Sequence, residues 1–349
     1  MKTKIVRLDE NNIDFEELKI AGNIIKEGGL VAFPTETVYG LGGDAFNSES
    51  SMKIYKAKGR PSDNPLIVHI SNIEDIKKVA IDIPDIAYKV LDKFWPGPLT
   101  VILKKSPNLP KETTGGLDTV AVRMPVNIIA REFIKCAGGF VAAPSANISG
   151  RPSPTVAKYV IEDLDGRVDM IIDGGDSDIG LESTIIDLSV ENPVILRPGY
   201  ITQDDLLSVI EAVDIDKTII EGNSNIAPKA PGMKYRHYAP KGELTIVHGK
   251  SNDVVAYINL KTKEAKQNDL KTGIIATSSN VEYYDADIIK DIGPKEDEVL
   301  IAKNLFRILR EFDEESVDVI YTEGFNTKGL SLATMNRLLK AAGHKEVYL

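Results

Sequence analysis

The chain of 349 residues is 42% hydrophobic and 27% charged, an ordinary globular composition that is long enough for two domains with a sizeable core. Its formal net charge of −10 argues against a broadly basic nucleic-acid surface, because binding to the phosphate backbone depends on clustered Lys and Arg. Cys136 is the only cysteine, no stretch reaches about 18 uninterrupted apolar residues and no secretory signal pattern is present, so we expect a cytoplasmic protein without disulfides, thiolate metal sites or membrane spans.

The first 215 residues alternate helical and strand patterns. Apolar residues at helical spacing predict helices over 14–29, 48–58, 83–94, 127–136, 202–213 and one that ends at Leu164. Short apolar runs predict strands over 30–33, 65–70, 99–105, 119–125, 168–175, 183–189 and 193–199, a strand-to-loop unit over 139–155, and a glycine-containing loop over 34–45. This order is typical of a mixed α/β domain and not of a simple βαβ repeat.

The composition changes near residue 215. Residues 216–242 are rich in Pro and Gly and poor in apolar side chains, which predicts an extended linker. Beyond it, strands over 243–249, 272–278 and 317–324 alternate with helices near 252–260, 298–312 and 331–343. We therefore expect a larger mixed α/β domain over 1–215, the linker over 216–242, and a smaller Rossmann-like parallel-sheet domain over 243–349.

The common nucleotide and hydrolase motifs are absent. The chain has no G-x-x-x-x-G-K-[ST] loop, "GLGGDA" fails G-x-G-x-x-G in its last glycine, and neither H-E-x-x-H nor G-x-S-x-G occurs. The four histidines, at 69, 237, 248 and 344, are too scattered for an obvious metal cluster. Any phosphate must therefore be bound by another device.

One such device is a run of cations in "KAKGRPSDNP". Lys56, Lys58 and Arg60 stand within five residues and no carboxylate lies among them. A solvated charged face normally carries both signs, so the uniform sign favours binding of a polyanion, which Arg can contact bidentately and Lys as a point charge.

Four further groups of polar residues follow predicted strands, where ligands commonly bind in α/β folds. Each has a structural alternative: a tight turn, a helix cap, a core histidine or a surface ion pair. They are Thr35 and Thr37 in "PTETVYGLGG"; His69 at the end of its strand; Ser145, Asn147, Ser149 and Ser153 in "APSANISGRPSPT"; and Ser183, Thr184, Arg197 and Arg123 at other strand ends.

Taken together, these strings resemble the two-domain form of the L-threonylcarbamoyladenylate synthase family, whose catalytic part is a YrdC-like domain. The resemblance covers about residues 10–240 in family order, and the C-terminal hundred residues resemble the family in placement and pattern. It is carried by "PTETVYGLGGDA" (34–45), "KAKGRPSDNPLIVH" (56–69), "WPGPLT" (95–100), "VAVRMP" (120–125), "APSANISGRPSPT" (143–155), "ESTIID" (182–187), "RPG" (197–199) and "PGMKYRHYAP" (231–240).

The resemblance implies a fold and a reaction. The fold would be a twisted mixed sheet followed by the smaller Rossmann-like domain. The reaction would turn L-threonine, bicarbonate and ATP, with Mg²⁺ on the nucleotide and no protein metal ligands, into threonylcarbamoyl-AMP and pyrophosphate. A separate transferase would pass the product to an adenosine beside the anticodon of tRNA, so no strong nucleic-acid binding by this chain is expected.

The family pattern also implies roles for residues. Lys56, Lys58 and Arg60 would hold the triphosphate and stabilise charge as pyrophosphate leaves. Threonine would be surrounded by Thr37, His69, Arg123, the backbone at Ala143, and Ser183. ATP would be contacted by Arg60, Asn64, Thr119, Ser145, Asn147, Ser153 and Arg197, with Tyr235 of the linker closing over it and His237 and Tyr238 as the alternatives.

Two rival functions remain from the sequence. A double-stranded RNA or tRNA binding module could use the same cations without turnover, although the net charge of −10 counts against it. Carbamoyl transfer to another acceptor would require zinc-finger segments that a chain with one cysteine lacks.

Overall fold

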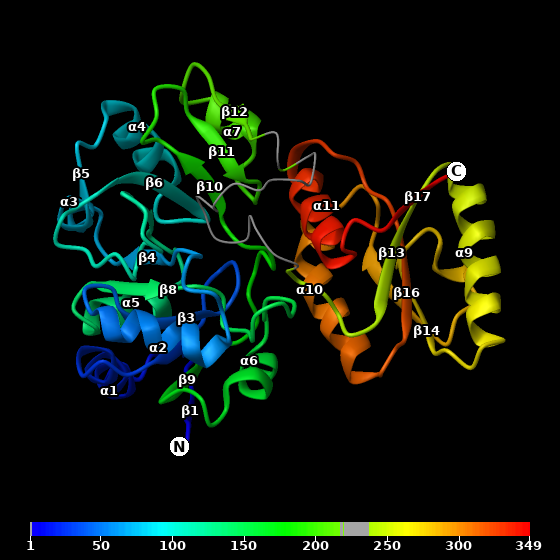
Figure 1. Ribbon diagram of the computed structural model, residues 1–349, viewed down its shortest axis with the longest axis horizontal. Helices are drawn as coiled ribbons and strands as arrows, with labels where there is room; N and C mark the ends of the chain where they lie inside the picture. Colours follow the sequence, from blue (N-terminus) through cyan, green and yellow to red (C-terminus); the bar gives the residue numbers. More distant parts are fainter. Residues whose placement is uncertain (1, 217–218, 220–236) are drawn as a thin grey trace. The chain divides into compact units, whose positions relative to one another are not determined.

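The structure is a computed structural model that describes residues 2–216, 219 and 237–349. These residues divide into two compact units, Met1–Ser149 with Ser153–Tyr235, and Gly150–Pro152 with Arg236–Leu349. Figure 1 colours most of the first unit blue to green and most of the second yellow to red. Within the described ranges, no helix is long and apolar enough to cross a membrane.

The first unit is built on one mixed sheet of 12 strands in its described residues. The short β5 (Ala80–Ile81) pairs only with β6. In spatial order the other strands are β1 (Lys4–Arg7), β9 (Met170–Asp173), β2 (Val31–Phe33), β3 (Gly40–Asp44), β8 (Phe140–Ala143), β4 (Ile67–Ile70), β7 (Thr119–Arg123), β6 (Leu99–Lys105), β10 (Thr184–Asp187), β11 (Val194–Arg197) and β12 (Asp214–Ile215). Parallel and antiparallel pairs alternate irregularly, which confirms the predicted mixed α/β fold.

Helices cover the sheet unevenly. α1 (Phe15–Lys26) and α5 (Ile128–Cys136) pack on one face, with Leu18, Ile25 and Phe133 buried against Phe33. The opposite face carries the larger core, to which α2 (Ser48–Lys58), α4 (Asp85–Phe94) and α6 (Ala157–Leu164) contribute. The short helices among the described residues of this unit are η1 (Ile73–Asp75), α3 (Ile76–Val79) and α7 (Gln203–Leu207).

Strand alternation separates core residues from polar residues in the centre of this sheet. Val68, Val101 and Val122 lie in the larger core, so their neighbours in sequence point to the other face. Register places His69 beside Arg123, and Arg123 beside Thr100, in one row across β4, β7 and β6. The next row on that face is apolar, with Ile67, Ala121 and Ile102 in one small cluster. The polar row of His69, Arg123 and Thr100 and the apolar row beside it, called the apolar floor below, frame the candidate site.

The expectation of a loop over 34–45 is wrong for its second half, because Gly40–Asp44 form β3, antiparallel to β2. The glycines permit close packing: a Cβ at Gly42 would lie 2.6 Å from Val141 Cγ1, and one at Gly40 would lie 2.9 Å from the Phe33 ring. Glycine runs suggest turns in a sequence, but here they allow a strand to lie under large side chains.

The second unit contains a five-stranded sheet in the order β15, β14, β16, β13, β17, and every pair is parallel. Figure 1 shows α9 on one side of this sheet and α10 and α11 on the other, which confirms the predicted Rossmann-like pattern. The elements are β13 (Glu243–His248), α9 (Ser251–Lys266), β14 (Thr272–Thr277), η2 (Val281–Tyr283), β15 (Ile288–Gly293), α10 (Glu298–Glu314), β16 (Val319–Glu323), α11 (Gly329–Ala341) and β17 (Glu346–Tyr348).

The close approach of α1 and α5 gives a stability prediction. A Cβ on Gly22 would lie 2.5 Å from the carbonyl carbon and oxygen of Cys136, and these backbone atoms cannot rotate away. Gly→Ala inside a helix normally stabilises by about 1 kcal/mol. Here we expect Gly22→Ala to destabilise by about 1–3 kcal/mol, because overpacking forces the helices apart.

The measurement is denaturant unfolding followed by fluorescence of Trp95, the only tryptophan and a buried residue of the first unit. Asn23→Ala, at the next and exposed position of α1, is the matched control and should be neutral or slightly stabilising. A Gly22→Ala protein more stable than the wild type would contradict the packing described.

Candidate active site

His69 lies one residue before the end of β4, within the polar row, and is 4% exposed. Its Nδ1 lies 3.1 Å from the carbonyl oxygen of Ile67, and its ring meets Phe33 edge-on at 5.9 Å. Burial, together with the positive charge of Arg123, lowers the pKa of His69 to about 3. The imidazole is therefore neutral near pH 7 and acts as a hydrogen-bonding group.

Arg123, at the end of β7, is a buried cation tied to the β2–β3 connection. Its Nη2 donates to Glu36 Oε1 at 2.7 Å, its Nη1 to Thr37 Oγ1 at 2.7 Å, and its Nε to the Gly97 carbonyl at 3.4 Å. The connection is itself held by Thr35, whose Oγ1 accepts the N–H of Thr37 at 3.2 Å. A turn and a strand distant in sequence thus converge on one guanidinium.

A second arginine organises the start of β10. Arg197 donates from Nε to the Ser183 carbonyl at 3.0 Å and from Nη2 to Ser183 Oγ at 3.1 Å. Ser183 Oγ also lies 2.7 Å from Thr100 Oγ1, which joins this group to the polar row. The "RPG" turn ends at Gly199, where a larger residue would not fit, because a Cβ there would lie 2.4 Å from the Thr184 amide nitrogen.

Lys58 anchors the loop that follows β8. It is 1% exposed, and its Nζ donates to the Ser145 carbonyl at 2.5 Å and also to the Asn147 carbonyl. Ser145 Oγ donates to Asn147 Oδ1 at 2.5 Å, so both predicted nucleotide contacts sit at this ammonium group. Farther along the loop, Ser153 Oγ donates to Glu182 Oε1 at 2.6 Å, beside Ser183.

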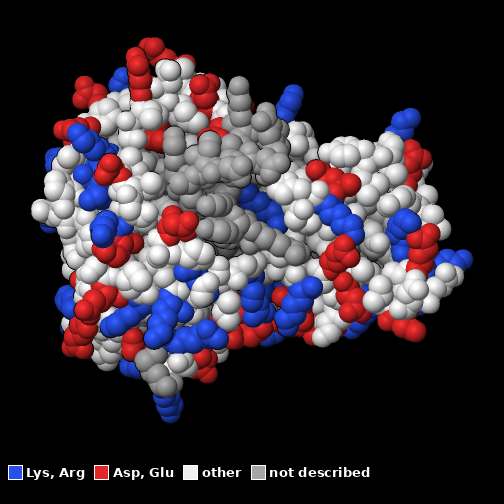
Figure 2. Space-filling model, viewed as in Figure 1, with Lys and Arg blue, Asp and Glu red and all other residues white. Residues whose placement is uncertain are grey.

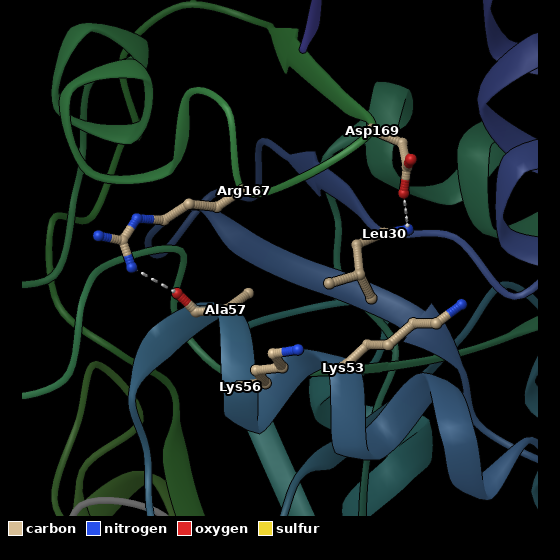
Figure 3. Close-up of a pocket in the computed structure, with 6 residues that line it drawn as sticks. All are labelled: Leu30, Lys53, Lys56, Ala57, Arg167 and Asp169. Atoms are coloured by element: carbon tan, nitrogen blue, oxygen red, sulfur yellow. Dashed lines mark hydrogen bonds between the residues drawn. The ribbon is translucent and has the colours of Figure 1, made fainter. Parts of the chain in front are cut away.

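The structure does not bring Lys56 to Lys58. Residues two positions apart on a helix point in directions that differ by about 200°, so the two lysine side chains leave α2 on different sides. Lys56 is exposed and lines a surface hollow of about 430 Å³ with Lys53 and Arg167, as Figure 3 shows. In Figure 2, Lys and Arg gather over α2, whereas both signs intersperse over the rest of that face. The cation run therefore serves two separate places.

Asn64 and Thr119 lie at the amino ends of β4 and β7, opposite the ends that carry His69 and Arg123. The two ends of β7 are roughly 13 Å apart. Asn64 is fully buried, yet neither side-chain amide atom has a hydrogen-bond partner in the part of the chain that the structure describes. Buried amides are normally satisfied, so this one is suited to a ligand. Arg60 reaches the same place and donates from Nη2 to the Pro65 carbonyl at 3.2 Å.

The remaining predicted residues have simpler placements. Ala143 ends β8 opposite Ile67, at the edge of the apolar floor. Tyr235 lies outside the described residues. Of its alternatives, His237 and Tyr238 belong to the second unit, where the Tyr238 ring packs on Phe306 at 5.0 Å.

Sequence reasoning missed Glu36, Thr100 and Glu182 as members of this cluster. The period-two alternation of "LTVILKK" would have put Thr100 and Ile102 on the face of Arg123. Glu36 lies between Thr35 and Thr37, whose hydroxyls were the predicted ligand groups of that loop.

The assembled groups suit an anion and a small polar molecule side by side. Buried guanidinium and ammonium groups attract phosphate and carboxylate oxygens, and hydroxyls and amides can fix orientation. Within residues 2–216, 219 and 237–349, no three His, Cys, Asp or Glu side chains gather to hold a metal.

Two family models match the chain. One, described as Telomere recombination and comprising Sua5, YciO and YrdC proteins, matches residues 23–199. The other, described as Threonylcarbamoyl-AMP synthase, C-terminal domain, matches residues 201–343.

Individual relatives match over the full length. The chain is 48% identical over 343 residues to the threonylcarbamoyl-AMP synthase of Pyrococcus abyssi, covering 98% of each chain. It is 43% identical over 351 residues to that of Bacillus subtilis, covering 99% of this chain and 100% of the other. The solved structure of P. abyssi Sua5 complexed with L-threonine matches with a TM-score of 0.94 at 47% identity, over 99% of this chain and 100% of that one.

The lowered pKa of His69 predicts a pH effect on stability. The folded state holds this pKa at about 3, whereas the unfolded chain has about 6.5, so between these values the unfolded state binds more protons. We expect wild-type stability to fall as pH drops below about 6.5, and His69→Gln to remove that part of the slope.

Urea unfolding of the first unit, followed by Trp95 fluorescence between pH 4 and 7.5, measures this. His344→Gln, at an exposed position, is the matched control and should leave the slope unchanged. Parallel profiles for wild type and His69→Gln would mean that His69 is not held neutral.

The separation of the two lysines predicts unequal effects on nucleotide binding. Lys58→Met removes a buried ammonium that holds Ser145 and Asn147, so ATP affinity should drop at least about tenfold. Lys56→Met changes a surface charge and should alter it by about twofold or less. Calorimetric titration with ATP compares the two variants. Equal losses of ATP affinity would contradict the separation and favour the single cation cluster predicted from the sequence.

Proposed function

The chain belongs to the two-domain threonylcarbamoyl-AMP synthase family, and we propose that it forms threonylcarbamoyl-AMP and pyrophosphate from L-threonine, bicarbonate and ATP. The observation that carries the proposal is the full-length identity of 48% to a relative of that name. The reaction makes it a nucleotidyltransferase, since an AMP group moves from pyrophosphate to a carboxylated amino acid.

The polar row and its neighbours would seat the amino acid. Arg123 offers N–H groups to the threonine carboxylate, and neutral His69 and the hydroxyl of Thr37 lie beside it. Ser183 and the backbone of Ala143 complete the surroundings, and the apolar floor at Ile67 suits the threonine methyl group.

ATP would extend from this point over the loop after β8 and the amino ends of β4 and β7. Ser145, Asn147, Ser153 and Arg197 contact it from one side, and Asn64, Thr119 and Arg60 from the other. The unsatisfied amide of Asn64 supports this placement, because a nucleotide can both donate to and accept from it. Tyr235 stays the proposed closing residue.

The chemistry needs positioning more than a protein base. Threonine and bicarbonate give N-carboxythreonine and water, and a carbamate oxygen then attacks the α-phosphorus. The new P–O bond forms as the bond to the bridging oxygen of the β-phosphate breaks, and pyrophosphate leaves. Lys58 and Arg60 would stabilise its negative charge. Lys56, the third predicted cation, lines the separate surface hollow, so its charge would contribute little.

Mg²⁺ would arrive on the nucleotide. The described residues offer no cluster of three metal-ligating side chains, so we propose coordination by phosphate oxygens and water. Bound there, the ion neutralises phosphate charge. We place the reaction in the cytoplasm, where a separate transferase would consume the adenylate in modifying tRNA.

Arg60→Ala tests the role of this cation in the reaction. A charge-assisted contact to phosphate is worth on the order of 1.5–3 kcal/mol, so adenylate formation should fall at least tenfold. Pyrophosphate release that depends on both threonine and bicarbonate is the assay. Lys53→Ala, which removes a cation of the Figure 3 hollow, should leave turnover near the wild-type rate.

Near-normal turnover of Arg60→Ala would contradict the assignment. Wild-type protein that binds double-stranded RNA in a salt-sensitive way, without releasing pyrophosphate, would favour the nucleic-acid module instead.

A further inference from the structure

Glu36 has a carboxylate oxygen that nothing in residues 2–216, 219 and 237–349 satisfies. The side chain is 3% exposed, and its Oε1 accepts from Arg123 Nη2 at 2.7 Å. Its Oε2 is buried and has no hydrogen-bond partner among the described residues. A lone buried oxygen of a charged group is costly, and native sites that retain one commonly present it to a ligand.

The neighbourhood of Oε2 limits what that ligand can carry. Thr37 Oγ1 already receives Arg123 Nη1 at 2.7 Å, and Thr35 Oγ1 lies 2.9 Å from the same hydroxyl. His69 is neutral, and its Nδ1 faces the Ile67 carbonyl oxygen, to which it can only donate. A second anion next to Glu36 would be repelled, so the missing partner is a hydrogen-bond donor, preferably a cation.

Arg123 also has capacity left. A guanidinium carries five N–H groups, and three are used in the contacts to Glu36, Thr37 and Gly97. Two N–H groups therefore remain for an incoming acceptor. The pair Arg123–Glu36 thus presents unused donors on one member and an unused acceptor on the other.

An α-amino acid complements this pair in charge and in order. Its carboxylate matches the remaining N–H groups of Arg123, and its ammonium group matches Glu36 Oε2. The buried ion pair and the zwitterion would then form a closed ring of alternating charges, in which no charge is left unpaired.

We propose that Glu36 is a substrate-contacting residue whose Oε2 accepts hydrogen bonds from the amino group of threonine. The inference rests on the proposed function, since it adds a contact to the amino-acid seat of that reaction. It assigns the recognition of the amine to a side chain, whereas Arg123 recognises the carboxylate.

The test measures whether Glu36 is coupled to the amine itself. Full-length wild type and Glu36→Gln are titrated calorimetrically with three ligands: L-threonine, 2,3-dihydroxybutanoate of matching configuration, and L-2-aminobutanoate. The second ligand replaces the amine by a hydroxyl, and the third lacks the side-chain hydroxyl. Competition against threonine gives the affinity of any weak ligand.

The wild type should prefer threonine over the dihydroxy acid at least about tenfold. In Glu36→Gln that preference should shrink at least about fivefold, while the preference for threonine over 2-aminobutanoate changes by about twofold or less. Glu17→Gln makes the same chemical change at the surface pair with Lys4 and should reproduce the wild type throughout.

Two results would overturn the inference alone. If Glu36→Gln weakens threonine and the dihydroxy acid by one factor, Glu36 acts only by orienting Arg123. If the change appears with 2-aminobutanoate instead, Oε2 serves the threonine hydroxyl. Absence of saturable threonine binding by the wild type would remove the proposed function and the inference with it.

Thermal unfolding checks that Glu36→Gln is folded. Should it not fold, Glu36→Asp replaces it, because that variant keeps the charge for Arg123 but withdraws the second oxygen by one methylene. The same loss of preference for the amine is expected.

Discussion

The buried ion pair between Arg123 and Glu36 is the constraint on which the candidate site depends. Both side chains are at most 4% exposed, and removing one partner of such a pair typically costs about 3–5 kcal/mol because the other charge stays buried. The pair ties the turn between β2 and β3 to β7 in the middle of the sheet. In the sheet, β8 and β4 lie between β3 and β7. The same guanidinium also contacts Thr37 and the Gly97 carbonyl, and His69 and Thr100 are its register neighbours across the sheet.

The sheet supplies the second half of the arrangement. Alternation along β4, β7 and β6 directs valines into the larger core and leaves Ile67, Ala121 and Ile102 as a floor on the other face. Helices α1 and α5 pack against the strands nearer β1 and β9, as the core that they share shows. A ligand on the central strands therefore meets an apolar surface below and charged groups at its ends, which is the usual composition of a small-molecule site.

Much of this could be predicted from the sequence, and the failures have physical causes. Most interior strands were predicted from their apolar runs, although the glycine-rich β3 was expected to be a loop. The four outermost strands, β1, β12, β15 and β17, were missed. Such edge strands are half solvated, so their residues lack that signal. Lys56 and Lys58 are adjacent in a string yet diverge on a helix, whereas Ser183 and Arg197 are far apart in the string yet touch. Motifs indicate which residues belong to a site, and only the fold indicates which atoms meet.

The outermost pairing of the first sheet governs how the molecule can be made. Thr3 hydrogen-bonds Val168 across 165 residues, and β1 finds its partner only in β9. At translation rates of about 5–20 residues per second, β9 is synthesised on the order of ten seconds after β1, so β1 cannot pair before then. High contact order of this kind slows folding and leaves nascent sheet edges open to wrong partners. Chaperone capture of the growing chain is thus most useful before β9 has been synthesised.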